Sequence, residues 1–149
     1  MIEIQVFDEN KLTSEEVKNE MIDFLFTHLE QYGDPKQHIR KCVDYSLKVI
    51  ESFGGFALTG RIDGELVGVV VVNGTGMGGY IPENILVYIA THNAYRGKGI
   101  GKELMKKTLE IADGDVKLHV EHDNPARFLY EKFGFTNKYL EMRYKNTSK

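Results

Sequence analysis

The chain has 149 residues, of which 42% are hydrophobic and 28% are charged, and its formal net charge is −3 at pH 7. These values are typical of one soluble globular domain with a single core. A slightly negative protein has no general attraction for nucleic acid, so no nucleic-acid partner is expected. The longest apolar run, residues 66–72, is far too short to span a bilayer, so no membrane partner is expected either.

Cys42 is the only cysteine, which excludes an internal disulfide and a cysteine metal cluster. The first 16 residues lack the basic stretch and apolar core of a signal peptide. Both features predict a protein of the reducing cytoplasm. No histidines or carboxylates show convincing metal-ligand spacing, so no metal is expected. A homodimer is compatible with the sequence, and the oligomeric state is left open.

The first third of the chain predicts a strand and two helices. Residues 2–7 alternate apolar and polar side chains, as in a half-buried strand. Thr13 followed by Glu16 fits a capping box, and the helix behind it has one apolar face: Val17, Met21, Phe24, Leu25 and Leu29. Asp34 before Pro35 predicts a second helix start. Its apolar stripe is Ile39, Val43, Leu47 and Ile50, and Gly54–Gly55 is expected to end it.

The rest of the chain predicts strands and two more helices. Strands over 56–62 and 66–73 meet at Asp63–Gly64, the strongest hairpin signal in the chain. A strand over 84–91, a helix over 99–112 and a strand over 116–121 follow, and Leu104, Leu109 and Ile111 are available to pack the helix. A short helix over 125–133 ends at Gly134, and alternation over 139–144 predicts a last strand. This order predicts a mixed α/β sheet in one domain, residues 1–149.

A glycine-rich turn, RGKGIG at residues 96–101, stands between the 84–91 strand and the next helix. The free N–H groups of a first helical turn attract anions, and glycine lets the backbone approach phosphate closely. Arg96, Lys98 and Lys102 add positive charge there. A dinucleotide fingerprint is excluded because its third glycine would fall at Lys102 or Leu104, and a P-loop because Arg96 replaces its first glycine. A simple flexible turn is the alternative.

Two motifs in order resemble one known family. RGKGIG after the strand ILVYIATH resembles the acyl-CoA-binding motif [RQ]-x-x-G-x-[GA] of the GNAT superfamily of N-acetyltransferases. Residues 123–135, DNPARFLYEKFGF, resemble its second hallmark, with an Asn-containing helix start, a tyrosine on the helix and a Gly-Phe ending. The resemblance implies a mixed, mostly antiparallel twisted sheet flanked by helices, with splayed central strands. It also implies acetyl transfer from acetyl-CoA to a primary amine of a small molecule or peptide by direct attack.

The resemblance places the coenzyme along three segments of the chain. The pyrophosphate would lie on the amides of the turn, which are those of Arg96, Gly97, Lys98, Gly99, Ile100, Gly101 and Lys102. The pantetheine arm would bond to the backbone of Ile89, Ala90 and Thr91, where an amide would also stabilise the oxyanion. Asn124, or Asp123 by strict spacing from Tyr130, would bind the coenzyme arm. Many members carry Asn at the position of Asp123, so the contact stays open between the two.

Two residues resemble the catalytic groups of the family. Tyr130 matches the tyrosine that faces the coenzyme sulfur, and a phenol can protonate a departing thiolate. A core tyrosine is the alternative. Glu83, thirteen residues before Arg96, matches the general base of the histone acetyltransferase branch, and a solvated loop glutamate is the alternative. Glu121, His119 and Tyr88 are weaker candidates for the base.

The acceptor is the main open question. A polyamine, an aminoglycoside-like drug, an amino acid or a protein N-terminus would each supply an amine. The helices between residues 13 and 53 and the loop over 73–84 would shape its pocket. Within that loop, GTGMGG at 74–79 is interpreted as a mobile hairpin loop beside the acceptor cleft. A non-catalytic sensor that binds acyl-CoA, and an enzyme using another acyl-CoA such as succinyl-CoA, are the competing hypotheses.

Overall fold

The computed structural model describes residues 1–148. They fall into two compact units that divide after Leu118. The first unit holds the whole sheet and most of the helices, and the second holds one short helix. The division concerns compactness alone, so a single domain over residues 1–149 stays a prediction.

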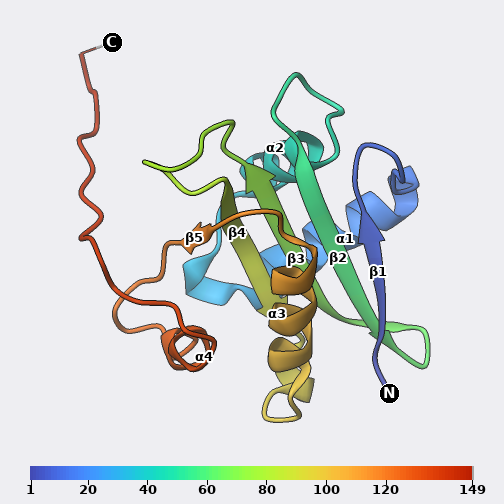
Figure 1. Cartoon of the computed structure of the whole chain (residues 1–149). Helices are drawn as coiled ribbons and strands as arrows, with labels where there is room; N and C mark the ends of the chain where they lie inside the picture. Colours follow the sequence, from blue (N-terminus) through green and yellow to red (C-terminus); the bar gives the residue numbers. More distant parts are fainter. Residues whose placement is uncertain (149) are drawn as a thin grey trace. The chain divides into compact units, whose positions relative to one another are not determined.

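The elements of the first unit follow one another in the order that the sequence predicts, and Figure 1 labels the α-helices and strands among them. They are β1 (Glu3–Phe7), α1 (Glu15–His28), η1 (Glu30–Tyr32), α2 (Lys36–Ser46), β2 (Gly55–Ile62), β3 (Glu65–Gly74), β4 (Asn84–Thr91), η2 (Asn93–Tyr95), α3 (Ile100–Ile111) and β5 (Val116–Leu118). The second unit contains α4 (Arg127–Lys132). No helix among residues 1–148 combines the length and the apolar character needed to cross a membrane.

The sheet has five strands in the order β1-β2-β3-β4-β5. Neighbours from β1 to β4 are antiparallel, and β4 and β5 are parallel. The predicted mixed, mostly antiparallel α/β sheet is therefore confirmed. The β2–β3 hairpin turns at Asp63 and Gly64, which have φ angles of 50° and 83°. A tight two-residue hairpin turn requires two positive φ angles, so the hairpin predicted at Asp63–Gly64 is confirmed.

Helices cover both faces of the sheet, with α1 and α2 on one face and α3 on the other (Figure 1). β3 is consequently buried on both faces, which explains its nearly unbroken apolar run from Leu66 to Val72. The core on the α1–α2 face contains most of the predicted helical stripes, namely Met21, Phe24, Leu25, Ile39, Val43 and Leu47. This core fixes α1 and α2 against β3 and β4.

α3 approaches the sheet closely because two strand positions lack a side chain. A Cβ atom at Gly68 would lie 2.4 Å from Leu104 Cδ1, and one at Gly60 would lie 3.3 Å from Leu104 Cδ2. Leu104 and Met105 are fully buried, whereas Leu109 and Ile111 are only partly buried. The packing of α3 therefore depends on Leu104, as predicted, and on Met105 in place of the two later residues.

Both ends of the α1–α2 segment differ from the prediction. The N-cap of α1 is Ser14, whose side chain accepts the N–H of Val17, so the predicted capping box at Thr13 is wrong by one residue. α2 ends near Leu47 and leaves Ile50 outside, because Lys48 adopts a φ of 56°. The N–H of Lys48 bonds to Tyr45 O and that of Val49 to Asp44 O. These two bonds form a Schellman motif, which stops the helix before Gly54.

Two strand predictions near the C-terminus need correction. β5 covers Val116–Leu118 and stops short of Glu121, because its pairing with β4 ends at Leu86 and Leu118. The predicted strand over 139–144 is wrong: these residues have no regular structure, and Tyr139 and Tyr144 are exposed. Alternation shows only which side chains would share a face, and a strand also needs a neighbour for its backbone bonds. In the second unit, Gly134 ends α4 with a φ of 95°, as predicted.

Candidate active site

The glycine turn between β4 and α3 has the geometry of an anion site. Gly97 and Gly99 have φ angles of 80° and 79°, and a Cβ at either would meet nothing within 4 Å. The first backbone bond of the helix joins Glu103 N to Gly99 O, so the amides of residues 100–102 precede the helical ladder. Free amides beside open space at a helix N-terminus are what a phosphate group binds. The turn thus fits the pyrophosphate of coenzyme A.

The three cations of the turn divide into two roles. Arg96 donates from Nη2 to the carbonyl of His28 at 3.0 Å, and its Nη1 lies 3.4 Å from Glu30 Oε1. Its guanidinium is therefore directed to the end of α1. Lys98 Nζ lies 5.4 Å from the ring centroid of Tyr95, and Lys102 is exposed. Lys98 and Lys102 supply positive charge at the turn, while Arg96 links the start of the turn to the end of α1.

β4 presents an unpaired backbone edge just before this turn. Its parallel pairing with β5 covers Asn84 to Leu86, and Val87 is skipped in its register with β3, as in a β-bulge. From Ile89 to Thr91, β4 keeps its bonds to β3, and no other described strand pairs with its second edge. The N–H and C=O groups of that edge suit an extended ligand that bonds as a strand does. The predicted splay would leave such an edge open, and His92 and η2 separate this edge from the glycine turn.

Glu83 lies just before β4 and its carboxylate is occupied by backbone donors. Oε1 accepts the N–H of Asp115 at 2.7 Å. This bond, with further ones from the amides of Glu83 itself and Gly79, lowers the pKa of Glu83. A Cβ at Gly114 would lie 2.5 Å from Oε1, so a glycine there lets the carboxylate reach the segment before β5. This environment suits an anchor better than a base, and the catalytic role of Glu83 stays a prediction.

Tyr88 follows the bulge and points into the α1–α2 face of the sheet. Its hydroxyl donates to Asp34 Oδ2 at 2.5 Å. Burial, reinforced by this carboxylate, raises the pKa of Tyr88 far above its usual value. A phenol held in its protonated form does not accept protons near neutral pH, so the environment argues against Tyr88 as the base.

The loop over residues 74–79 is closed at its base by hydrogen bonds. Thr75 donates its N–H to Glu83 O at 2.9 Å and its hydroxyl to Pro82 O at 2.7 Å. Gly76 and Gly79 take positive φ angles of 73° and 77°. These bonds join the two ends of the segment between β3 and β4, and the mobility of the loop and its place beside an acceptor cleft stay predictions.

The second unit carries the other predicted site residues. Tyr130 lies on α4, is 7% exposed, and burial raises its pKa to about 12. Asn124 Oδ1 accepts the N–H of Ala126 at 2.9 Å, so this side chain shapes the start of the helical segment. Asp123, His119 and Glu121 are exposed. A phenol that stays protonated is available as a proton donor, which is compatible with the role predicted for Tyr130.

Comparison with known proteins decides the family. Residues 17–135 match the model of the acetyltransferase (GNAT) family. The protein belongs to the GNAT family. None of the curated proteins matches the chain in sequence.

Solved structures of similar fold agree with this GNAT assignment. PH1933 from Pyrococcus horikoshii OT3 has a TM-score of 0.72 at 22% identity, with 95% of this chain and 93% of that chain covered. A ribosomal-protein-alanine N-acetyltransferase from Brucella melitensis biovar Abortus 2308 has a TM-score of 0.63 at 19% identity, covering 98% and 100%. An aminoglycoside acetyltransferase from an uncultured soil metagenomic sample has 0.69 at 17%, covering 99% and 99%. At these sequence identities, the similarity to the solved structures shows the fold alone.

The family assignment makes this GNAT protein an acetyl-CoA-dependent acetyltransferase, and the GNAT family uses acetyl-CoA. The open strand edge and the glycine turn both lie within residues 89–102 of the first unit, separated by His92 and η2. The described residues hold no group of three or more His, Cys, Asp or Glu side chains that could bind a metal ion.

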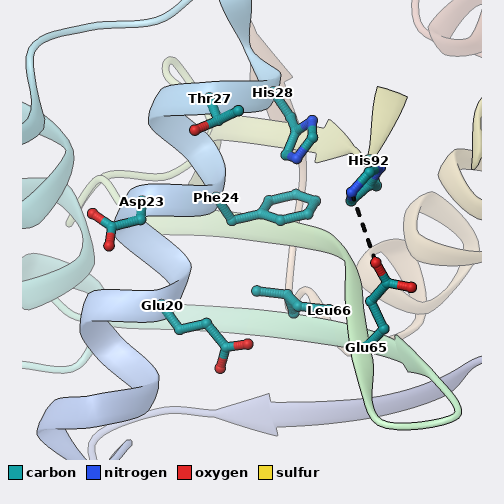
Figure 2. A pocket seen from close by; sticks show the side chains of 8 residues that line it. All are labelled: Glu20, Asp23, Phe24, Thr27, His28, Glu65, Leu66 and His92. Atoms are coloured by element: carbon teal, nitrogen blue, oxygen red, sulfur yellow. Dashed lines mark ion pairs between the residues drawn. The ribbon is translucent and has the colours of Figure 1, made fainter. Parts of the chain in front are cut away.

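The sequence analysis assigned no role to two histidines that precede or contact the segment leading into the glycine turn. His28 and His92 line an open pocket of about 320 Å³ together with Glu20, Asp23, Phe24, Thr27, Glu65 and Leu66 (Figure 2). His28 lies one helical turn after Phe24, and their ring centroids are 4.5 Å apart. The spacing of Phe24 and His28 on the apolar face of α1 was the feature of the sequence that could have indicated a buried histidine. It indicates burial of His28 but not its contact with His92, whose ring centroid lies 4.3 Å away.

Proposed function

We propose that this GNAT protein transfers the acetyl group of acetyl-CoA to a primary amine of a small molecule or peptide by direct attack. One observation carries the proposal: an unpaired strand edge, Ile89–Thr91, is followed after His92 and η2 by the glycine turn with its free amides and open space. The two features suit the pantetheine arm and the pyrophosphate of one coenzyme molecule.

Each part of the site then has a task. The amides of residues 96–102 and the side chains of Lys98 and Lys102 bind the phosphates, and the backbone of residues 89–91 orients the arm so that the thioester lies along β4. An N–H of that edge stabilises the oxyanion as the amine nitrogen attacks the carbonyl carbon. Asp123 or Asn124 is our candidate residue for binding the coenzyme arm.

The reaction needs two proton movements. The acceptor arrives as an ammonium and must lose a proton before it attacks, and Glu83, directly or through one water, is our candidate acceptor of that proton. As the C–S bond breaks, the electron pair goes to sulfur and Tyr130 donates a proton to the thiolate. The raised pKa of Tyr130 supports its assignment as the acid, because its hydroxyl keeps its proton at neutral pH.

The proposed class of acceptor is based on the names of two proteins with a similar fold. Two proteins of similar fold are named a ribosomal-protein-alanine N-acetyltransferase and an aminoglycoside acetyltransferase. The first name specifies nitrogen as the acceptor atom. We therefore assign an amine acceptor and the cytoplasm as the compartment, where the buried Cys42 thiol would stay reduced.

A screen of amines with acetyl-CoA tests the proposal by following thiol release and the acetylated product by mass. The panel holds a polyamine, an aminoglycoside, free amino acids and a peptide with a free N-terminus, and each is repeated with succinyl-CoA. A reaction without acceptor measures thioester hydrolysis. Transfer to an amine supports the proposal. Tight coenzyme binding with no transfer to any member would favour a sensor module instead.

A further inference from the structure

The C-terminal end of α1 holds the segment that leads into the glycine turn. His28 Nδ1 accepts the N–H of Asn93 at 3.2 Å, and His28 O accepts from Arg96 Nη2 at 3.0 Å. Glu30 adds an ion pair to Arg96 at 3.4 Å. Three contacts from one helix end thus fix both ends of η2, although the partners are 65 to 68 residues apart in the chain.

A second imidazole completes this arrangement. His92 Nδ1 accepts the N–H of Ala94 at 3.1 Å, and the rings of His28 and His92 have centroids 4.3 Å apart. Figure 2 shows the two rings side by side, one from α1 and one from the segment after β4. An Nδ1 atom that accepts an N–H carries no proton, so the proton of each neutral ring is on Nε2. The two histidines therefore hold consecutive amides at the start of η2.

We propose that His28 is a positioning residue for coenzyme binding, whose unprotonated Nδ1 fixes η2 and thereby orients the glycine turn that follows. Only five residues, 94–98, separate the amide that it holds from Gly99 at the start of α3. A rotation of η2 would turn the amides of the turn away from a bound phosphate. The inference rests on the proposed coenzyme site at residues 96–102.

This role makes coenzyme binding sensitive to acid. A protonated imidazole donates from both nitrogens, so His28 in that form would confront the N–H of Asn93 with a second donor. Arg96 faces the ring with positive charge, a protonated His92 would add to it, Glu30 faces the ring with negative charge, and Glu65 lies 3.9 Å from His92 Nε2. Burial first, then His92 and Arg96, lower the pKa of His28 below 6.5 against the opposing effect of Glu30.

The direction of the effect follows from these groups. Near neutral pH, His28 is unprotonated and its contact with η2 is intact. As the pH falls through the lowered pKa of His28, the ring gains a proton and the contact is lost. The open pocket beside His28 and His92 gives solvent protons a route to both rings. Coenzyme affinity should therefore decline on the acid side of neutrality.

Two substitutions separate positioning from packing. His28→Asn carries an amide oxygen close to the place of Nδ1 and cannot titrate, whereas His28→Leu fills the space without an acceptor. Affinity for coenzyme A is measured by calorimetry between about pH 7.5 and about pH 5.5. At the higher pH, we expect His28→Leu to bind about tenfold more weakly. His28→Asn should bind nearly as the wild type does and lose part of the decline in acid. His92→Asn, which removes the partner imidazole and leaves His28 in place, is the matched control.

A measurement on the free protein tests the contact without the coenzyme. In isotope-labelled wild-type protein, the NMR signal of the Asn93 amide should shift with pH in parallel with the ring nitrogens of His28. Parallel titration supports the proposal even if His28→Leu fails to fold. The proposal is overturned if the Asn93 signal is indifferent to His28 titration, or if folded His28→Leu and His28→Asn both bind coenzyme A as the wild type does. Absence of coenzyme binding in the wild type would instead refute the proposed function.

Discussion

Gly99→Val tests the coenzyme site most directly, and the hairpin offers a matched control in Gly64→Val. Gly99 and Gly64 have φ angles of 79° and 83°, and a Cβ at either meets nothing within 4 Å. Both substitutions therefore cost backbone strain of about 1–2 kcal/mol without a clash. For a chain of this size, that strain lowers Tm by about 5 °C in each variant.

Only Gly99→Val should affect the coenzyme, because its side chain would fill the space beside the free amides of residues 100–102. Each hydrogen bond to a charged phosphate contributes about 1.5–3 kcal/mol. Loss of two such bonds weakens binding by about 3 kcal/mol, which is a factor of about 100 or more. Calorimetry with coenzyme A measures it. If the two valine variants lose equal stability and both bind coenzyme as the wild type does, the site is not at this turn.

Three further predictions concern catalysis and stability. Tyr130→Phe should lower kcat by about 10²–10⁴-fold with little change in acetyl-CoA affinity, and an unchanged kcat in steady-state assays would leave Tyr130 a packing residue. Glu83→Gln keeps an oxygen that can accept the Asp115 N–H, so a mere anchor should keep its kcat; a base should lose kcat and regain rate as the pH rises and free amine becomes abundant. Lys48→Gly should raise the free energy of unfolding by about 0.5–1 kcal/mol in urea titrations, because Lys48 occupies a left-handed position with a φ of 56°; a loss of stability would contradict this.

The features that the sequence predicted well are set by local signals. β4 begins at Asn84 and ends at Thr91 as predicted, because branched residues favour the strand and polar residues bound it. The positive φ angles at Gly97 and Gly99 could also be expected from the sequence, because glycine adopts such angles without steric cost. In the same way, the Asp63–Gly64 turn needs no information from distant parts of the chain.

The features that it did not predict depend on distant partners. Arg96 was expected to face phosphate, but its guanidinium reaches the end of α1, and nothing in the turn itself indicates that. Tyr139 to Tyr144 alternate as a strand does, yet alternation does not supply a neighbouring strand. Ser14 and Thr13 are both good caps, and only the extended backbone at Ser14 decides between them.

The close packing of α3 against Gly68 connects the core of the protein with the proposed coenzyme site. Any side chain at Gly68 would meet Leu104, since a Cβ there already lies 2.4 Å from Leu104 Cδ1, and carbon atoms need about 3.5–4.0 Å. The helix would have to rise by roughly 1 Å, and its first-turn amides would rise with it. Mutational libraries limited to cleft-lining positions would pass over Gly68. A screen for altered acyl-donor use should therefore include this core glycine together with compensating, smaller residues at position 104.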